Sequence, residues 1–149
     1  MDDEYAEITR QLAVLMRRVG RLHAAGDDLV DRSAYFVLGR LVNGGPARLS
    51  ALAAELALDL SVVSRQVATL EAAGLVDRAP DPADRRASLI TASEAGVEAF
   101  DRKRERFVAL LRAALKDWSA ADRRQFAQLF ARFNEAMIST HGSDAWVRR

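Results

Sequence analysis

Two short helical patterns separated by a brief break, and followed directly by a change to strand periodicity, constrain this fold more than any other feature. The two patterns lie within residues 48–78. Apolar residues recur on one face of each pattern, and we expect them to be buried: Leu52, Ala53 and Leu56 in the first, and Leu60, Val63, Val67 and Leu70 in the second. Ser50 is the expected N-cap of the first helix, and the second begins near Asp59 or Ser61. Gly74 supplies the left-handed residue that commonly ends a helix. We therefore predict helix, tight turn and helix, which places the second helix on a surface.

After Gly74 the sequence takes on the character of β-strands. Residues 75–78 and 87–91 are short and β-prone, and the connector between them is rich in proline and aspartate, as a hairpin loop requires. We predict a two-stranded hairpin whose loop carries Arg85 and Arg86. Taken alone, such a charged loop favours a solvated turn, so the role of the two arginines depends on what lies beside them.

Helical periodicity also covers both ends of the chain. The first segment has an apolar stripe made of Tyr5, Ile8, Leu12, Leu15, Val19 and Leu22, and we expect its helix to end at Gly26-Asp27-Asp28. A second helix is expected to start with Ser33 as its cap and to stop at Asn43-Gly44-Gly45-Pro46. After the hairpin, Ser93 or Thr91 caps a long helix with these residues inward: Val97, Phe100, Phe107, Leu110, Leu111 and Leu115. A last helix carries Phe126, Leu129, Phe130, Phe133 and Met137.

Composition excludes several classes of protein. The chain has 149 residues, half of them apolar, which is enough for one core and a single domain with two lobes at most. No apolar run is long enough to span a membrane, and the acidic start lacks a signal-type core, so we expect a cytoplasmic protein. The lack of cysteine excludes disulfides and thiolate metal sites. With two distant histidines, no phosphate loop and no nucleophile motif, we expect no metal, no cofactor, no catalytic residues and no enzyme activity.

The outward face of the second helix of the pair is small, polar and singly basic. Its residues are Ser61, Val62, Arg65, Ala68 and Thr69. Small residues allow close approach to a DNA major groove, and a few hydrogen-bonding tips read base edges or phosphates. Ser61 and Ser64 suit phosphates or base edges, Arg65 suits guanine or phosphate, and Gln66 or Thr69 would reach flanking positions. An ordinary surface helix rich in small residues remains the alternative.

A hairpin beside such a helix gives the two arginines a role. An arginine on a thin loop suits a narrow minor groove, where the electrostatic potential is most negative. Asp84 is close enough in sequence to hold such a guanidinium through charge-assisted hydrogen bonds. The charge balance of this region argues weakly against DNA binding, because its arginines are matched in number by acids: Arg65, Arg78, Arg85 and Arg86 against Glu71, Asp77, Asp81 and Asp84.

These stretches together resemble the MarR family of bacterial winged-helix transcriptional regulators. The resemblance is carried by Ser64-Arg65, Leu70-Glu71, Gly74-Leu75-Val76, Asp84-Arg85-Arg86 and Ser93-Glu94-Ala95-Gly96. It covers nearly the whole chain and implies a mainly α, α+β fold, with a winged helix-turn-helix lobe over residues 33–92. Residues 1–26 and 93–142 would form a helical dimerisation region. Ala92 stands where the family more often has leucine, which leaves the end of the second strand open.

The resemblance also implies what the chain does. We expect a sequence-specific regulator of transcription, a repressor, that binds double-stranded DNA as a homodimer on a pseudo-palindromic operator. The implied DNA contacts are Ser61, Val62, Ser64, Arg65, Gln66, Thr69, Arg85 and Arg86. Of these, Ser61, Ser64 and Arg65 would lie in the major groove. Arg86 would enter the minor groove, oriented by Asp84, whereas Arg85 is a phosphate contact or solvated.

The two ends of the chain supply the expected dimer interface. Its candidate residues are Tyr5, Ile8, Leu12, Leu15, Phe126, Leu129, Phe130, Phe133 and Met137. These stripes offer more apolar surface than one lobe can cover, which marks an interface. An intramolecular bundle of the same helices is the alternative.

The family commonly responds to small aromatic or phenolic effectors bound between the dimer region and the DNA-binding lobe. The candidate pocket residues are Met16, Val19, His23, Tyr35, Phe36 and Arg40. His23 or Arg40 would pair with an acidic ligand, although a surface histidine and a solvated arginine are the simpler interpretations. The lack of cysteine excludes the thiol-oxidation sensing of one branch of the family. There are two rival functions. A winged helix that binds protein would have an apolar or acidic recognition helix and a wing without arginines, and this sequence has neither; an architectural DNA-binding protein without an effector is the other rival.

Overall fold

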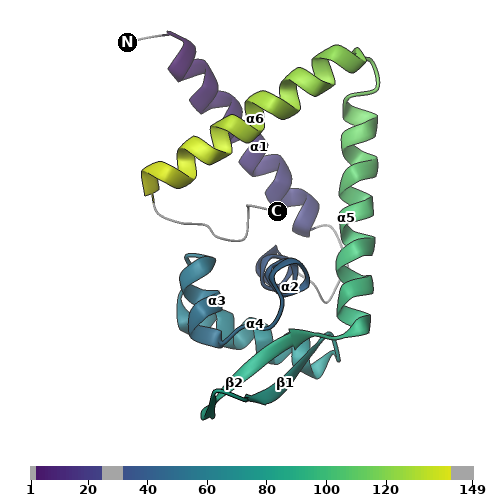
Figure 1. Ribbon diagram of the computed structural model, residues 1–149. Helices are drawn as coiled ribbons and strands as arrows, with labels where there is room; N and C mark the ends of the chain where they lie inside the picture. The colour runs from purple at the N-terminus through teal and green to yellow at the C-terminus, as the bar shows by residue number, and fades with distance from the viewer. Residues whose placement is uncertain (1–2, 25–31, 142–149) are drawn as a thin grey trace.

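The computed structural model describes residues 3–24 and 32–141 (Figure 1). Its elements in chain order are α1 (Asp3–Ala24), α2 (Arg32–Gly44), α3 (Leu49–Glu55), α4 (Leu60–Ala72), β1 (Val76–Asp81), β2 (Asp84–Ala92), α5 (Glu94–Ala114) and α6 (Ala120–His141). The mainly helical fold with one antiparallel two-stranded sheet confirms the predicted class. No helix within the described ranges is both long and apolar enough to cross a bilayer. The predicted end of the first helix at residues 26–28 lies outside the described residues.

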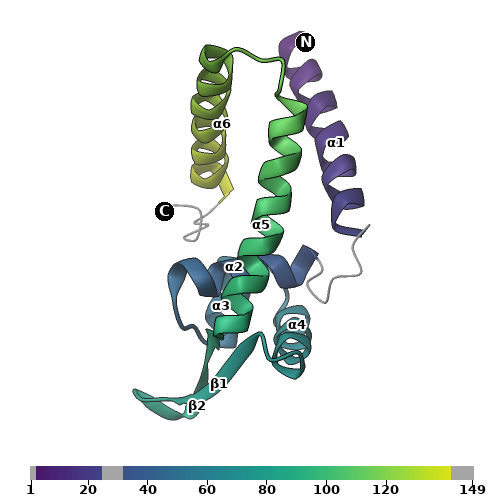
Figure 2. The same cartoon turned by 90° about the vertical axis from the view of Figure 1, so that its right-hand side faces the viewer.

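One compact lobe lies at the lower end of the molecule, and α5 rises from it as a long rod. The lobe contains α2, α3, α4 and the hairpin, with the hairpin projecting from its base. In Figure 1 α1 and α6 overlap, but the turned view of Figure 2 shows that they stand on opposite sides of α5. The chain therefore has a packed half and an open half.

The hydrophobic core lies entirely within the packed half. Its largest fully buried side chains are Leu38, Leu52, Leu70, Ile90, Val37, Val63, Val67 and Val76. Three of the four residues predicted to be buried on the second helix of the pair are fully covered, but Leu60 is 54% exposed. Leu60 is the first residue of α4, and a side chain at a helix end has neighbours on one side only. The helical pattern located the buried face but overestimated its length.

Two of the predicted helix caps are wrong. Ser33 lies inside α2, which begins at Arg32. Ser50 lies inside α3, whose N-cap is Arg48 and has no side-chain cap hydrogen bond. The reason for the second error is an isolated bridge in which Ala47 exchanges hydrogen bonds of 3.0 and 2.8 Å with Ile90. This pairing fixes where the extended segment ends, so α3 starts earlier than its serine suggests.

The start of α5 is tied to the root of the hairpin. Ser93, one of the two predicted caps, accepts a hydrogen bond on Oγ from the Gly96 N–H at 3.1 Å, which confirms it. The same hydroxyl donates to the Gly74 carbonyl at 2.6 Å, and the Ser93 N–H donates to the Leu75 carbonyl at 3.1 Å. Gly74 has φ +71°, the left-handed conformation predicted for it. Helix, hairpin and the preceding turn are therefore joined at one point.

The hairpin is longer than predicted, and its tip is irregular. Val76 pairs with Ala92 at the root, and the register continues to Pro80 opposite Ser88 before it shifts, so that Asp81 pairs with Asp84. Arg85, Arg86 and Ala87 consequently belong to β2 but fall in the shift, where the register assigns them no cross-strand partner. The sequence left the end of the second strand open, and in the structure β2 ends at Ala92.

The open half exposes many large apolar side chains. The far part of α5 exposes Leu110 at 42% and Leu111 at 47%, although we predicted that both would point inward. Across the described ranges, little else packs on this half of α5, which is why these residues stay uncovered. Aromatic rings also stack along the exposed face of α6, with Phe126 and Phe130 5.7 Å apart. A closed bundle within one chain is therefore not formed.

Candidate nucleic-acid interface

α4 presents a small, mostly polar face to the exterior and is buried on its opposite side. Val63, Val67 and Leu70 are fully buried and fix the helix in the lobe. The opposite face exposes five of the predicted contact residues and neighbours, namely Ser61, Ser64, Arg65, Ala68 and Thr69, while Val62 and Gln66 are half-buried. The hydroxyl of Thr69 already donates a hydrogen bond to the Arg65 carbonyl at 3.0 Å. The remaining face is small enough for close approach to a groove.

The arginines of the lobe divide into two groups. The residues 33–92 contain six arginines, and three of them have acidic partners: Arg40 with Glu55, Arg48 with Asp81, and Arg78 with Glu71. Arg65, Arg85 and Arg86 make no ion pair and no side-chain hydrogen bond with any residue of the described ranges. Of the acids that balance the charge in the sequence, Glu71 lies within ion-pair distance of Arg78, and Asp81 and Asp84 lie within ion-pair distance of Arg48. Positive charge is left on the exposed face of α4 and at the hairpin tip.

Asp84 shapes the hairpin tip through the backbone. Its Oδ1 accepts a hydrogen bond from the backbone N–H of Arg86 at 3.1 Å. We predicted a contact with an arginine guanidinium of the tip, and the structure has a main-chain contact instead. The reason is geometric, because a carboxylate two residues before an N–H closes a local turn more readily than it reaches a long side chain. The Arg86 guanidinium thus remains available to a ligand.

Asp81 is a second acidic anchor of the tip and is 7% exposed. It accepts the Ala83 N–H at 2.8 Å and the Arg48 Nε at 2.7 Å, while Nη2 of Arg48 lies 2.5 Å away. The Ala83 amide, followed by the Arg48 guanidinium, holds the pKa of Asp81 below its ordinary value. Arg48 was missed by the sequence reasoning, because nothing local connects it with a carboxylate 33 residues later.

Arg40 is paired with an acid of the lobe. Its Nε and Nη2 contact both carboxylate oxygens of Glu55, and Nη1 donates to the Gly45 carbonyl at 3.2 Å. Only 13% of its side chain is exposed. The interpretation as a solvated arginine is therefore wrong, and an acidic ligand would have to compete with Glu55 for this largely buried guanidinium. The Arg40 hydrogen bond also lowers the pKa of Glu55.

The other predicted pocket residues are only partly brought together. Tyr35 stacks on Phe100 with ring centroids 5.0 Å apart and meets the edge of Phe36 at 6.2 Å. Burial raises the pKa of the Tyr35 hydroxyl. Met16, by contrast, is 65% exposed on α1, and the side chain of His23 lies outside the described residues.

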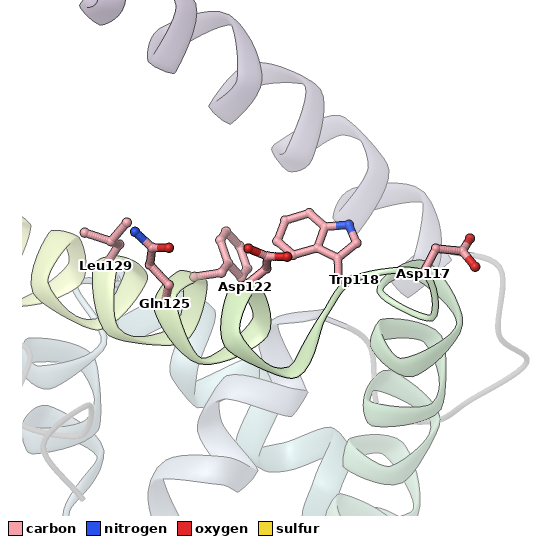
Figure 3. A pocket seen from close by; sticks show the side chains of 6 residues that line it. Asp117, Trp118, Asp122, Gln125 and Leu129 are labelled. Atoms are coloured by element: carbon pink, nitrogen blue, oxygen red, sulfur yellow. The ribbon is translucent and has the colours of Figure 1, made fainter.

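A hollow lies elsewhere, where α5 turns into α6 (Figure 3). It measures about 460 Å³ and is lined by Asp117, Trp118, Asp122, Gln125, Phe126 and Leu129. Two of these residues, Phe126 and Leu129, are predicted dimer contacts, and none is a predicted pocket residue. This hollow therefore belongs to the uncovered face of α6.

A helix-turn-helix with an exposed second helix, followed by a hairpin with unpaired arginines, defines a winged-helix DNA-binding module. The sequence model of the MarR family matches residues 30–87. An uncharacterized HTH-type transcriptional regulator of Bacillus subtilis, YxaD, is 38% identical over 109 residues, covering 73% of this chain and 76% of YxaD. The chain belongs to the MarR family and is a transcriptional regulator, not an enzyme.

Solved structures share the fold over nearly the full length. A MarR protein of Peptoclostridium difficile superposes with a TM-score of 0.75, at 17% identity, over 99% of this chain and 93% of that one. The PcaV transcriptional regulator of Streptomyces coelicolor, in complex with its natural ligand, has a TM-score of 0.62 at 23% identity, over 89% and 92% of the two chains. At these identities the likeness shows the fold alone.

Proposed function

We propose that this chain is a sequence-specific repressor that binds double-stranded DNA as a homodimer and acts in the cytoplasm. The observation that carries the proposal is the placement of unpaired arginines. Arg65 on α4, and Arg85 and Arg86 on the wing β1–β2, have no acidic partner within the described chain, whereas Arg40, Arg48 and Arg78 do. Unneutralised guanidinium groups on a small polar surface suit a polyanion.

In this proposal α4 lies in the major groove and the wing in the minor groove. Ser61, Ser64 and Arg65 contact bases or phosphates, and Val62, Gln66 and Thr69 flank them. Arg86 enters the minor groove, and Asp84 orients it by holding its backbone N–H. Arg85 contacts a phosphate.

The homodimer is supported by the apolar surface of the open half. Tyr5, Ile8 and Leu15 on α1 are 45–68% exposed, and Phe126, Leu129, Phe130 and Met137 on α6 are 40–51% exposed. Leu12 and Phe133, also in the proposed interface, are half-buried. An apolar surface of this extent is typical of an interface. A two-fold axis would set the two recognition helices about 34–36 Å apart, one DNA turn, and the operator would be pseudo-palindromic.

A small aromatic or phenolic effector is proposed to release the DNA. The Tyr35, Phe36 and Phe100 rings at the junction of the lobe and α5 offer the apolar wall, with Met16, Val19 and His23 supplied by α1. The related fold of PcaV was solved with its natural ligand, which supports a ligand-responsive regulator. Arg40 has no part in this pocket.

Substitution of the unpaired arginines tests the DNA-binding surface. On an operator selected from random-sequence DNA by the wild-type protein, Arg86→Ala should weaken binding, and Arg65→Ala should relax the base preference by about 1–3 kcal/mol at the contacted position. Arg112→Ala in the last turn of α5 is the matched control, because it removes an exposed arginine that likewise has no ion pair within the described ranges. Unchanged operator affinity for Arg86→Ala with an intact dimer would show that the minor-groove assignment is wrong. Equal loss on all sequences would reduce Arg65 to a phosphate contact.

The dimer is tested by charge placed on the α6 face. Leu129→Asp with Phe130→Asp should halve the mass measured by light scattering from twice 16.4 kDa to 16.4 kDa. Both residues are exposed in the single chain, so its own core should survive. Gln128→Asp on the same helix is the control. A monomeric wild-type protein, or a double variant that stays dimeric, would refute the α6 interface.

A further inference from the structure

The wing tip is held by contacts that reach outside the hairpin. Asp81 ends β1, and one of its oxygens accepts the Ala83 N–H at 2.8 Å, which folds the turn. Its other oxygen accepts from Arg48 at 2.7 Å. One carboxylate thus both closes the turn and joins the tip to the residue before α3.

Arg48 reaches a second carboxylate as well. Its Nη1 lies 3.9 Å from Oδ2 of Asp84, the residue whose Oδ1 holds the backbone N–H of Arg86. Side-chain exposure is 41% for Arg48 but only 9% for Asp81, so the carboxylate of the shorter contact is largely removed from solvent. A single guanidinium therefore connects the helix-turn-helix to both acids that shape the segment carrying Arg86.

The hairpin itself provides little support at this point. Arg85, Arg86 and Ala87 lie in the register shift between the paired residues Asp84 and Ser88. Pro80, opposite Ser88, has no N–H to donate. An isolated two-stranded hairpin is marginally stable at best. An ordered tip consequently depends on an anchor from another element.

We propose that Arg48 is a positioning residue for DNA binding, which acts through Asp81 to fix the height and direction of the wing tip that presents Arg86. This inference rests on the proposed function, since it concerns how the wing meets DNA. A tip that is already ordered loses little conformational freedom when it binds, and that loss is a main cost of association.

The rival role for Arg48 is a direct contact with a DNA phosphate. The two roles differ in what removal of the Asp81 charge does. If Arg48 acts through Asp81, Asp81→Asn has the same effect as Arg48→Ala, because each breaks the same ion pair. If Arg48 binds a phosphate, Asp81→Asn frees the Arg48 guanidinium, and the affinity for DNA is kept or strengthened.

The first test uses the free protein and needs no DNA. Backbone ¹⁵N relaxation of the full chain should give order parameters of about 0.85 at residues 83–87 in the wild type and below about 0.6 in Arg48→Ala and Asp81→Asn. The control is Arg78→Ala, which breaks the 3.3 Å pair with Glu71 at the root of the same hairpin. Order parameters that stay at the wild-type level in Arg48→Ala would overturn the inference.

The second test uses the selected operator. Arg48→Ala and Asp81→Asn should each lower affinity roughly tenfold per wing, the cost of ordering a few residues on binding. They should lose hydroxyl-radical protection of the minor groove at the wing while guanine N7 protection by α4 persists. Asp77→Asn, which removes an exposed charge from β1, corrects for charge alone.

A loss of affinity in Arg48→Ala without a loss in Asp81→Asn would overturn the positioning role in favour of a phosphate contact. If the wild type selects no DNA, the proposed function fails, and the relaxation result still decides whether Arg48 anchors the wing.

Discussion

Replacement of Gly96 by alanine should destabilise the protein, although alanine is the better helix former. Gly96 is buried in the first turn of α5. A Cβ at this position would stand 2.0 Å from the carbonyl oxygen of Leu75 and 3.2 Å from Cδ1 of Leu38. The first distance is far inside van der Waals contact with a backbone atom, so α5 or the wing root must move.

The expected size follows from three opposing contributions. Helix propensity alone would stabilise Gly96→Ala by about 1 kcal/mol. Forced overpacking costs about 1–3 kcal/mol. Displacement of the Leu75 carbonyl also weakens the 3.1 Å hydrogen bond that it accepts from Ser93, worth roughly 1 kcal/mol. Together these contributions lower the free energy of unfolding by about 1–3 kcal/mol. Each kcal/mol corresponds to roughly 2–4 °C in Tm for a chain near this size.

Urea unfolding followed by circular dichroism measures this loss, at one fixed protein concentration because the stability of a dimer depends on concentration. Gly20→Ala in α1 is the matched control, since a Cβ there meets nothing within 4 Å, and it should gain up to about 1 kcal/mol. If Gly96→Ala proves as stable as the wild type, α5 does not approach the wing root closely and the reasoning is refuted.

Two further predictions concern the lobe. Ile90→Ala should lower the free energy of unfolding by about 2–5 kcal/mol, because this fully buried residue packs in the core. Leu89→Ala, at the half-buried neighbour, should lower it clearly less. Equal losses in urea unfolding would contradict the core assignment. The pKa of Glu55 is lowered in the folded state by the hydrogen bond from Arg40, so its contribution to stability is complete above the ordinary value of 4.5 and is lost as pH falls through the lowered pKa. The wild type should therefore have a higher free energy of unfolding than Glu55→Gln at pH 7, and this difference should shrink in acid. A difference that does not depend on pH would contradict the ion pair between Arg40 and Glu55.

The elements of the lobe were predictable because their signals are local. Val63, Val67 and Leu70 recur at helical spacing, and Gly74 marks the end of α4 with its left-handed backbone. The helix caps were less predictable. A serine near a helix start competes with tertiary pairing, and at α3 the bridge between Ala47 and Ile90 decided the boundary. Such a pairing leaves no trace in the local pattern.

The charges of the site were the least predictable part. A count of charges along the sequence gives near balance, whereas the fold pairs Arg48 with an acid 33 residues away and Arg40 with one 15 residues away. Ion pairing across such separations depends on the packing of α2, α3 and the wing. The sequence could thus indicate which arginines stand near the expected groove, but not which of them remain unpaired.

In the proposed regulator, the junction between α5 and the lobe is where a signal from the helical ends would reach α4 and the wing. Phe100 packs over Gly39 of α2, where a Cβ would meet its ring at 2.8 Å, and Gly96 packs on the Leu75 carbonyl at the wing root. Ser93 adds hydrogen bonds to the same root. In the proposed ligand-responsive dimer, these contacts would couple a tilt of the far end of α5 to α4 and the wing. In the proposed dimer, such a rotation changes the separation of the two recognition helices, and an operator with a repeat of about 34–36 Å tolerates little change. Release of DNA would then follow from altered spacing between two intact lobes.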